Sequence, residues 1–153
     1  MNFKFCFLFF LFAWGSLFAC SCIGETSVKD GLKESSVVFV GRVVSQEEIT
    51  IPYKLSGTQT IIKYHYYKVI LKVQKVYKGK VKEDTVEIIT GIGNGDCGYS
   101  FETNKDYVVY SKFKDRYFNG GNKVSKFLYT DICTRTTSKV AEEEDNIKKY
   151  RKP

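Results

Sequence analysis

The stretch at residues 37–44, VVFVGRVV, gives the strongest indication of the fold. It is rich in β-branched residues and is bounded by Ser36 and Ser45, which is typical of a β-strand. Further apolar runs of this kind follow along the chain at residues 61–76, 85–90, 107–113 and 124–132. In the longest run, apolar and polar residues alternate, as expected for a strand with one buried face. The sequence therefore predicts five strands separated by polar or glycine-containing turns.

The remaining segments are more polar. Residues 45–60 predict a loop or an irregular extension of a hairpin. Ser27 and Asp30 have the spacing of a capping box, and they predict a short helix that is limited by Gly31. A second helix is expected at residues 138–150.

The second predicted helix carries acidic residues early, at 142–145, and lysines late, in accordance with the helix dipole. We expect Val140, Ile147 and Tyr150 to face the body of the protein and the acidic run to form a solvated face. Together with the strands, this pattern predicts a mainly β protein. The expected fold is a five-stranded Greek-key barrel of the oligosaccharide/oligonucleotide-binding (OB) type with one or two flanking helices. A β-sandwich is the alternative.

Residues 1–19 predict a cleaved export signal. A positive charge precedes a continuous apolar run at residues 5–12, which is too short to span a membrane, and small residues follow it. Cleavage after Ala19 would leave Cys20 as the first residue of a secreted single domain, residues 20–153. The Leu-Phe-Ala-Cys sequence that ends at Cys20 also resembles the lipobox of bacterial lipoproteins. That alternative would anchor Cys20 by a lipid at a bacterial cell envelope.

Four cysteines remain after the predicted signal, namely Cys20, Cys22, Cys97 and Cys133. An even number in an exported chain predicts two disulfides, and four cysteines allow three pairings. Lipidation of Cys20 would leave an odd thiol, so cysteine parity favours the free form.

The composition excludes several classes of protein. The chain carries 24 Lys and Arg against 17 Asp and Glu, a formal net charge of +7, and one histidine, His65. A single histidine without a Cys/His cluster cannot build a histidine-rich catalytic metal site or a zinc finger, and we expect His65 to be partly exposed. Residues 93–98 match the GxGxxG pattern of dinucleotide-binding sites. Such a site requires a helix directly after the glycines, and none is predicted there. With no catalytic constellation, we predict that the chain is not an enzyme.

Tyrosines and lysines are interleaved at residues 63–82. Such a surface binds nucleic acid or sulfated polysaccharide through charge and stacking. Export argues against nucleic acid, so sulfated glycans or matrix are the candidate partners of this stretch.

Several landmarks follow one another in a familiar order. They are the Cys-x-Cys at the predicted mature amino terminus, the VVFVGRVVS strand, a V-Y-K-G turn at residues 76–79, the Cys97-Gly98 loop, and an L-Y-T-D-I-C stretch that ends at Cys133 before the last predicted helix. This order and spacing resemble the tissue inhibitors of metalloproteinases. The likeness covers nearly all of residues 20–150 and corresponds to the inhibitory N-terminal domain of that family, the netrin-like domain.

The resemblance implies two disulfides and a mode of action. It pairs Cys20 with Cys97 and Cys22 with Cys133. It implies a secreted inhibitor of zinc metalloendopeptidases, in which the free amine and the backbone carbonyl of Cys20 chelate the catalytic zinc of the target protease. The zinc belongs to the target, so no cofactor of its own is expected. Ser21 would enter the specificity pocket of the protease. The other residues expected to contact the target are Cys22, Ile23, Gly95, Asp96 and Gly98.

The chain departs from the family pattern at two points. Where the family places a further cysteine ahead of the first strand, this chain has Lys33 or a neighbour, so we expect two disulfides in place of three. Ile23 and Gly24 stand where the family often has a proline. The competing hypothesis is a non-inhibitory netrin-like module, soluble or lipid-anchored at Cys20, that binds matrix or surface components. A membrane partner is expected only with that anchor, and we expect a monomer.

Overall fold

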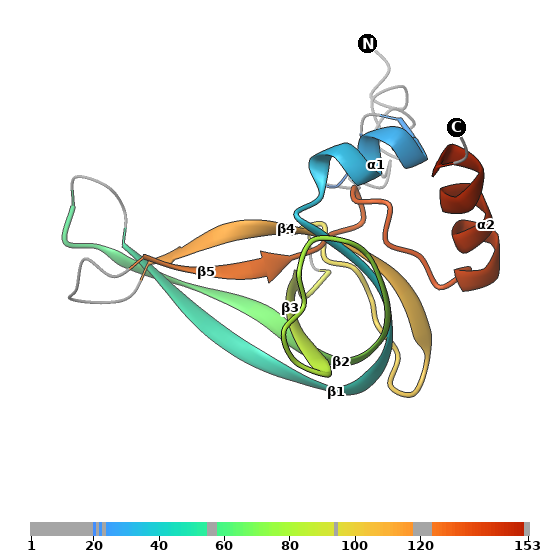
Figure 1. Cartoon of the computed structure of the whole chain (residues 1–153). Coiled ribbons are helices and arrows are strands. Elements are labelled where there is room, and N and C mark those ends of the chain that lie inside the picture. The colour runs from blue at the N-terminus through green and yellow to red at the C-terminus, as the bar shows by residue number, and fades with distance from the viewer. Residues whose placement is uncertain are drawn as a thin grey trace, which may run out of the picture.

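The computed structural model describes residues 20, 22, 24–54, 58–93, 95–117 and 124–151. Its elements are α1 (Val28–Glu34), β1 (Val37–Lys54), β2 (Ile61–Lys78), β3 (Thr85–Gly91), β4 (Asp106–Tyr117), β5 (Val124–Tyr129) and α2 (Val140–Arg151). The strands close into a barrel in the order β1-β2-β3-β5-β4. The fold is therefore the predicted mainly β, OB-like barrel with two helices (Figure 1). The predicted export signal lies outside the described residues.

β1 and β2 form a long antiparallel hairpin that runs past the end of the barrel (Figure 1). The first part of β1 also pairs with β4, from Val37 opposite Ser111 to Arg42 opposite Asp106. Register shifts along β1 mark β-bulges, which bend a strand and increase its twist, so that β1 can follow the curve of the barrel. The hairpin extension expected as one alternative for residues 45–60 is thus confirmed for its described part.

The other strands lie where the sequence predicts them, with shifted ends. β5 ends at Tyr129, earlier than the predicted residue 132. The reason is Thr130, whose amide donates to the carbonyl oxygen of Ile89 at 3.1 Å and whose hydroxyl donates to the carbonyl oxygen of Tyr110 at 3.0 Å. These two bonds hold Thr130 between β3 and β4, and the loop that carries Cys133 begins after it.

The main core fills the inside of the barrel with apolar side chains from the strands and from the loop before β4. Its buried members are Val37, Phe39, Val43, Val69, Leu71, Val86, Ile88, Phe101, Tyr107 and Val109. Burying one side chain of this size contributes about 1.5–3 kcal/mol. The core therefore gives the loops at the barrel ends a rigid support.

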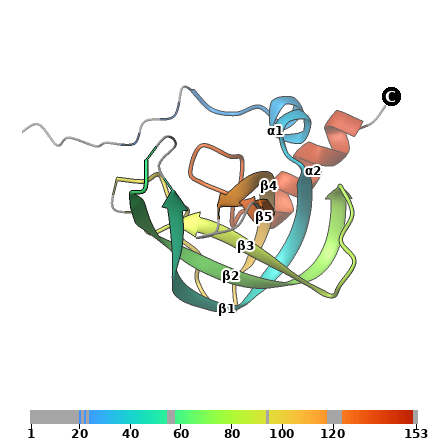
Figure 2. The same ribbon diagram turned by 90° about the vertical axis from the view of Figure 1, so that its left-hand side faces the viewer.

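A second core lies between the barrel and the helices, which sit on the same side of it (Figures 1 and 2). α1 begins as predicted, because the Asp30 amide donates to the Ser27 hydroxyl at 3.1 Å. The prediction that Gly31 limits this helix is wrong, since Gly31 lies inside it. A Cβ atom at Gly31 would meet the ring of Tyr110 at 3.1 Å, so the glycine lets α1 approach the barrel.

α2 corrects two predictions about its faces. Ile147 is buried as expected, but Tyr150 is 49% exposed and does not face the body. The acidic run is not wholly solvated either, because Glu143 is buried. His65 is exposed as predicted, and its Nδ1 lies 2.8 Å from a carboxylate oxygen of Glu48. No described helix has the length and apolarity needed to cross a membrane.

Candidate functional site

Two disulfides fix the start of the described chain to the barrel. Cys20 is bonded to Cys97 in the loop between β3 and β4, with 5.4 Å between their Cα atoms. Cys22 is bonded to Cys133 in the loop between β5 and α2, with 5.2 Å between their Cα atoms. These are the pairings that the family resemblance implied. We call residues 20, 22 and 24–26 the N-terminal wedge; Ser21 and Ile23 lie outside the described residues.

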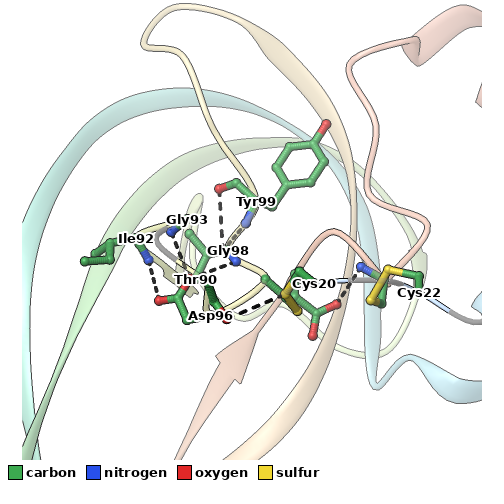
Figure 3. The surroundings of a disulfide bond; sticks show 12 residues. Cys20, Cys22, Thr90, Ile92, Gly93, Asp96, Gly98 and Tyr99 are labelled. Carbon is green, nitrogen blue, oxygen red and sulfur yellow. Dashed lines mark hydrogen bonds between the residues drawn. A yellow bond between two sulfur atoms is a disulfide. The ribbon is translucent and has the colours of Figure 1, made fainter. Parts of the chain in front are cut away.

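The loop that receives Cys20 is organised around the carboxylate of Asp96 (Figure 3). This carboxylate accepts hydrogen bonds from the amides of Ile92 and Gly93, both at 2.8 Å, and of Gly98 at 3.1 Å. Partial burial raises the pKa of Asp96, but the backbone donors outweigh it, so the pKa lies below its ordinary value. The charged form of Asp96 therefore holds the loop together beneath Cys20.

Close backbone contact at the base of this loop requires glycine. A Cβ atom at Gly98 would lie 2.1 Å from the carbonyl oxygen of Gly91, and one at Gly91 would lie 2.4 Å from the carboxylate of Asp96. Gly95 and Cys97 adopt positive φ angles of 88° and 59°. In the described part of this segment, the glycines allow a tight loop. The next element in the chain is the strand β4 and not a helix, so the segment lacks the arrangement of a dinucleotide site.

The two cysteine-bearing loops are also joined to each other. The amide of Ile132 donates to the carbonyl oxygen of Cys97 at 3.0 Å. The hydroxyl of Thr26 donates to the carbonyl oxygen of Cys133 at 3.1 Å. Cys20 Sγ lies 3.8 Å from the carbonyl oxygen of Gly95. Figure 3 shows Cys20 between the Asp96 loop and Cys22. The wedge therefore rests on both loops at once.

A partly buried ion pair holds the far end of the wedge. Arg135 donates to both carboxylate oxygens of Glu143, at 2.6 and 2.7 Å, and its Nη1 donates to the carbonyl oxygen of Thr26 at 2.7 Å. The hydroxyl of Tyr110 donates to the same carboxylate at 2.6 Å. The hydrogen bonds to Glu143 raise the pKa of Arg135. Burial raises the pKa of Tyr110, and Glu143 raises it further.

Buried threonines support the loop that carries Cys133. The Thr136 hydroxyl accepts a hydrogen bond from the Tyr110 amide at 2.9 Å and lies 2.7 Å from the Thr130 hydroxyl. The Thr134 hydroxyl lies 2.8 Å from that of Thr130 and donates to that of Thr136 at 3.1 Å. Unpaired buried hydroxyls are costly, and these are satisfied by one another and by the backbone of β4. The loop is thereby tied to the barrel independently of its disulfide.

A hollow runs beside the wedge. It has a volume of about 310 Å³, and its walls include Cys22, Thr26, Ile132 and Arg135. The side chain of Ile132 is 46% exposed there. The wedge thus borders a hollow in which an apolar side chain, that of Ile132, is exposed.

The predicted site residues are brought together only in part. Cys20, Cys22 and the Gly95–Gly98 loop segment lie side by side (Figure 3). The carboxylate of Asp96 is turned toward its own loop amides. Sequence reasoning missed Arg135 and Glu143. The helical spacing of Glu143 with Ile147 and Val140 was the available signal that this carboxylate faces inward.

The described residues contain no cluster of three or more His, Cys, Asp or Glu side chains that could hold a metal ion. The chelate that the family resemblance implies uses the backbone amine and carbonyl of Cys20, which needs no side-chain cluster.

Most of the chain, including both disulfides of this site, matches a known family. No curated protein matches the chain. The family model described as "Tissue inhibitor of metalloproteinase" matches residues 18–138, a range that includes both disulfides and all five strands. This match confirms the resemblance drawn from the sequence landmarks.

Proposed function

The chain belongs to the tissue inhibitor of metalloproteinase family, and from that premise we propose that it inhibits zinc metalloendopeptidases through the free amine and carbonyl oxygen of Cys20. The observation that carries this proposal is the double tether of the wedge. The Cys20 and Cys22 disulfides tie two residues that are close in sequence to two different loops, and so hold the Cys20 backbone beside both loops.

The chemistry of an α-amine suits this role. Its pKa in a free amino terminus is about 7.7–8.0, so it loses its proton readily beside a metal dication. The amine nitrogen and the carbonyl oxygen of one residue form a five-membered chelate. A catalytic zinc site has three protein ligands and an open position that holds water, and the Cys20 chelate would fill that position. The inhibitor would then need no metal of its own.

Preorganisation supports tight binding through few contacts. Chain termini are usually frayed, and ordering a flexible segment on binding reduces affinity. Here the Asp96 loop, the Cys133 loop and Arg135 hold the wedge before any target arrives. The wedge is therefore already ordered when the protein folds. Binding to the protease then does not lose free energy to ordering it.

The neighbouring residues have proposed roles in target recognition. Ser21 would point into the specificity pocket beside the zinc, and Ile23 would continue along the substrate-binding cleft. Gly95 and Gly98 would flank the wedge with little steric bulk. Asp96 would act mainly by holding the loop, because its carboxylate accepts three backbone hydrogen bonds.

The mechanism requires removal of residues 1–19, because only cleavage before Cys20 frees its amine. Export of the chain to an oxidising compartment would provide both that cleavage and the two disulfides. Lipidation of Cys20, the alternative processing, would block the amine. The disulfide between Cys20 and Cys97 supports the unlipidated form, because a thioether at Cys20 would leave Cys97 without a partner.

Glycan binding by β2 gains little support from the side-chain contacts. Lys68 pairs with Glu47, and Lys75 pairs with Glu144. Lys78 donates to two carbonyl oxygens at the end of α1. Three of the seven lysines in the Tyr/Lys stretch thus form contacts within the protein, and we do not propose a glycan site there.

The test compares two forms of the protein against a zinc metalloendopeptidase. One form begins at Cys20, and the other carries one additional alanine before it. The extension removes the free amine of Cys20 but leaves both disulfides and the barrel in place, which a mass spectrum and a circular dichroism spectrum would verify. We expect inhibition by the first form alone, and equal inhibition by both would refute the chelate.

A further inference from the structure

β3 and β5 close the barrel through very little backbone pairing. β3 pairs with β2 along Thr85–Gly91, and β5 pairs with β4 along Val124–Tyr129. Between β3 and β5 the described residues form a single pair, Ile89 with Tyr129, in parallel orientation. The ladder does not continue from this pair toward the beginnings of the two strands.

A groove of about 420 Å³ lies along this break. Its apolar lining includes Val81, Val86 and Leu128, all of which belong to the main core or pack against it. Phe113 of β4 also lines the groove, and its side chain is 55% exposed. The groove therefore exposes part of the barrel interior to solvent. None of its lining residues belongs to the wedge.

The groove carries excess positive charge. Lys80, Lys82 and Lys126 line it together with Glu83 and Glu87, so three cations face two carboxylates. The three lysines form no ion pair with any residue in the described part of the chain. Unpaired lysines beside an apolar floor favour a ligand that has both carboxylates and apolar groups.

The backbone of β5 points polar groups into the same groove. The amide of Thr130 is directed at β3, since it donates to the carbonyl oxygen of Ile89 at 3.1 Å. Successive residues of a strand direct their amides to opposite sides, so the amides of Leu128 and Lys126 also face the β3 side, away from β4. An open strand edge of this kind is a template for a further strand.

We propose that this groove binds an extended peptide segment of a partner protein that alternates acidic and apolar side chains. A strand added along β5 would pair with the backbone of Lys126 and Leu128. Every second side chain would then contact the apolar floor, and the intervening carboxylates would lie near Lys80, Lys82 and Lys126. The open strand edge favours a peptide over a fatty acid, which has no backbone groups to pair with it.

The probe is a fluorescein-labelled octapeptide of alternating aspartate and valine, titrated with the disulfide-bonded protein in low salt. We expect saturable binding measured by fluorescence anisotropy, weaker binding as salt rises, and no comparable binding of a peptide with the four aspartates and four valines in separate blocks. Two further peptides carry methyl groups on alternate backbone nitrogens, one on the odd-numbered residues and the other on the even-numbered residues. We expect at least one of these two peptides not to bind.

Two variants separate the groove from general charge. Lys82→Glu combined with Lys126→Glu should weaken binding of the alternating peptide about tenfold. Lys29→Glu, on the exposed surface of α1, is the matched control and should leave binding unchanged. Because Lys29, Lys82 and Lys126 are exposed, the variants should fold, and their circular dichroism spectra would verify this.

Several results would overturn the proposal. They are the absence of saturable binding, equal effects of Lys29→Glu and the groove variants, and equal binding of both methylated peptides and the unmodified one. Displacement of the peptide by oleate at lower concentration than by unlabelled peptide would make the groove a fatty-acid site. A dimer in light scattering that Lys82→Glu with Lys126→Glu dissociates would make it an interface between two copies of the chain.

Discussion

Arg135 donates a hydrogen bond of 2.7 Å to the carbonyl oxygen of Thr26, a residue 109 positions earlier in the sequence. The same guanidinium binds the buried carboxylate of Glu143 in α2. The helix at the end of the described chain is therefore linked to the wedge at its beginning through one side chain. The stability of the wedge and that of the α2 packing should respond together to changes at this position.

Replacing Arg135 by alanine should destabilise the protein by about 3 kcal/mol, because the buried Glu143 carboxylate would lose its charged partner. Urea unfolding measures this change. Inhibition of a zinc metalloendopeptidase should weaken as well, since Thr26 is released. Lys139→Ala, which removes only an exposed pair with Glu142, should change neither quantity appreciably. Equal stability of the Arg135 and Lys139 variants would contradict the structural role of Arg135.

Removing the second disulfide should separate the fold from the function. The Cys22→Ala, Cys133→Ala variant opens a link across 111 positions, which the chain-entropy model values at about 5 kcal/mol. We expect the barrel to remain folded near room temperature, with a lower denaturation midpoint and much weaker inhibition. Unchanged inhibition with the expected loss of stability would show that the wedge does not need its second tether.

The Asp96 loop should make stability dependent on acidic pH. The pKa of Asp96 in the folded protein is below its ordinary value, so its charged form contributes stability at neutral pH. That contribution is complete above the unfolded-state pKa of about 4 and is lost as the pH falls through the lower, folded-state pKa. Urea unfolding at a series of pH values measures the slope.

Asp96→Asn supplies the comparison for this pH series. The variant should be less stable at neutral pH and should show a shallower loss of stability below pH of about 4. Asp84→Asn is the control, because the Asp84 side chain is exposed and forms no ion pair with any described residue. A pH profile of Asp96→Asn that is parallel to that of the unmodified protein would contradict the role assigned to Asp96.

Gly98→Ala should disrupt the loop that receives Cys20. Its Cβ atom would overlap the carbonyl oxygen of Gly91, a backbone atom that cannot move aside easily. Gly93→Ala is the matched variant, because Gly93 has a positive φ of 88° but no atom within 4 Å of the added carbon. We expect a small loss of stability for Gly93→Ala and a large loss, with slow or incomplete formation of the Cys20–Cys97 disulfide, for Gly98→Ala. Thermal unfolding and peptide mapping measure the two effects.

Much of the barrel can be predicted from the sequence, because its strands carry their own signals. The apolar run of β1 and the alternation in β2 are local patterns, and burial in the barrel confirms them. The ends of strands are less local. β5 ends before Thr130, whose amide donates to a backbone acceptor in β3, the carbonyl oxygen of Ile89. No pattern in the sequence near residue 130 reveals this bond.

In the candidate site, too, some features can be predicted from the sequence and others depend on contacts that form only in the folded protein. The disulfide pairing was implied by resemblance to a family, since four cysteines alone allow three pairings. The burial of Glu143 was not predicted, because a run of acidic residues at a helix start normally faces solvent. Its burial depends on Arg135 and Tyr110, which approach only in the folded protein. The sequence predicts that Gly31 ends the first helix, but Gly31 lies inside α1 and leaves space for the ring of Tyr110.

The central claim, that the Cys20 backbone caps the zinc of a target protease, is tested most directly by a crystal structure of the complex. The protein beginning at Cys20 would be crystallised with a zinc metalloendopeptidase that it inhibits. We predict the Cys20 amine nitrogen and carbonyl oxygen at about 2.0–2.2 Å from the zinc, in place of the bound water. A complex in which the zinc keeps its water and Cys20 lies away from the metal would contradict the account.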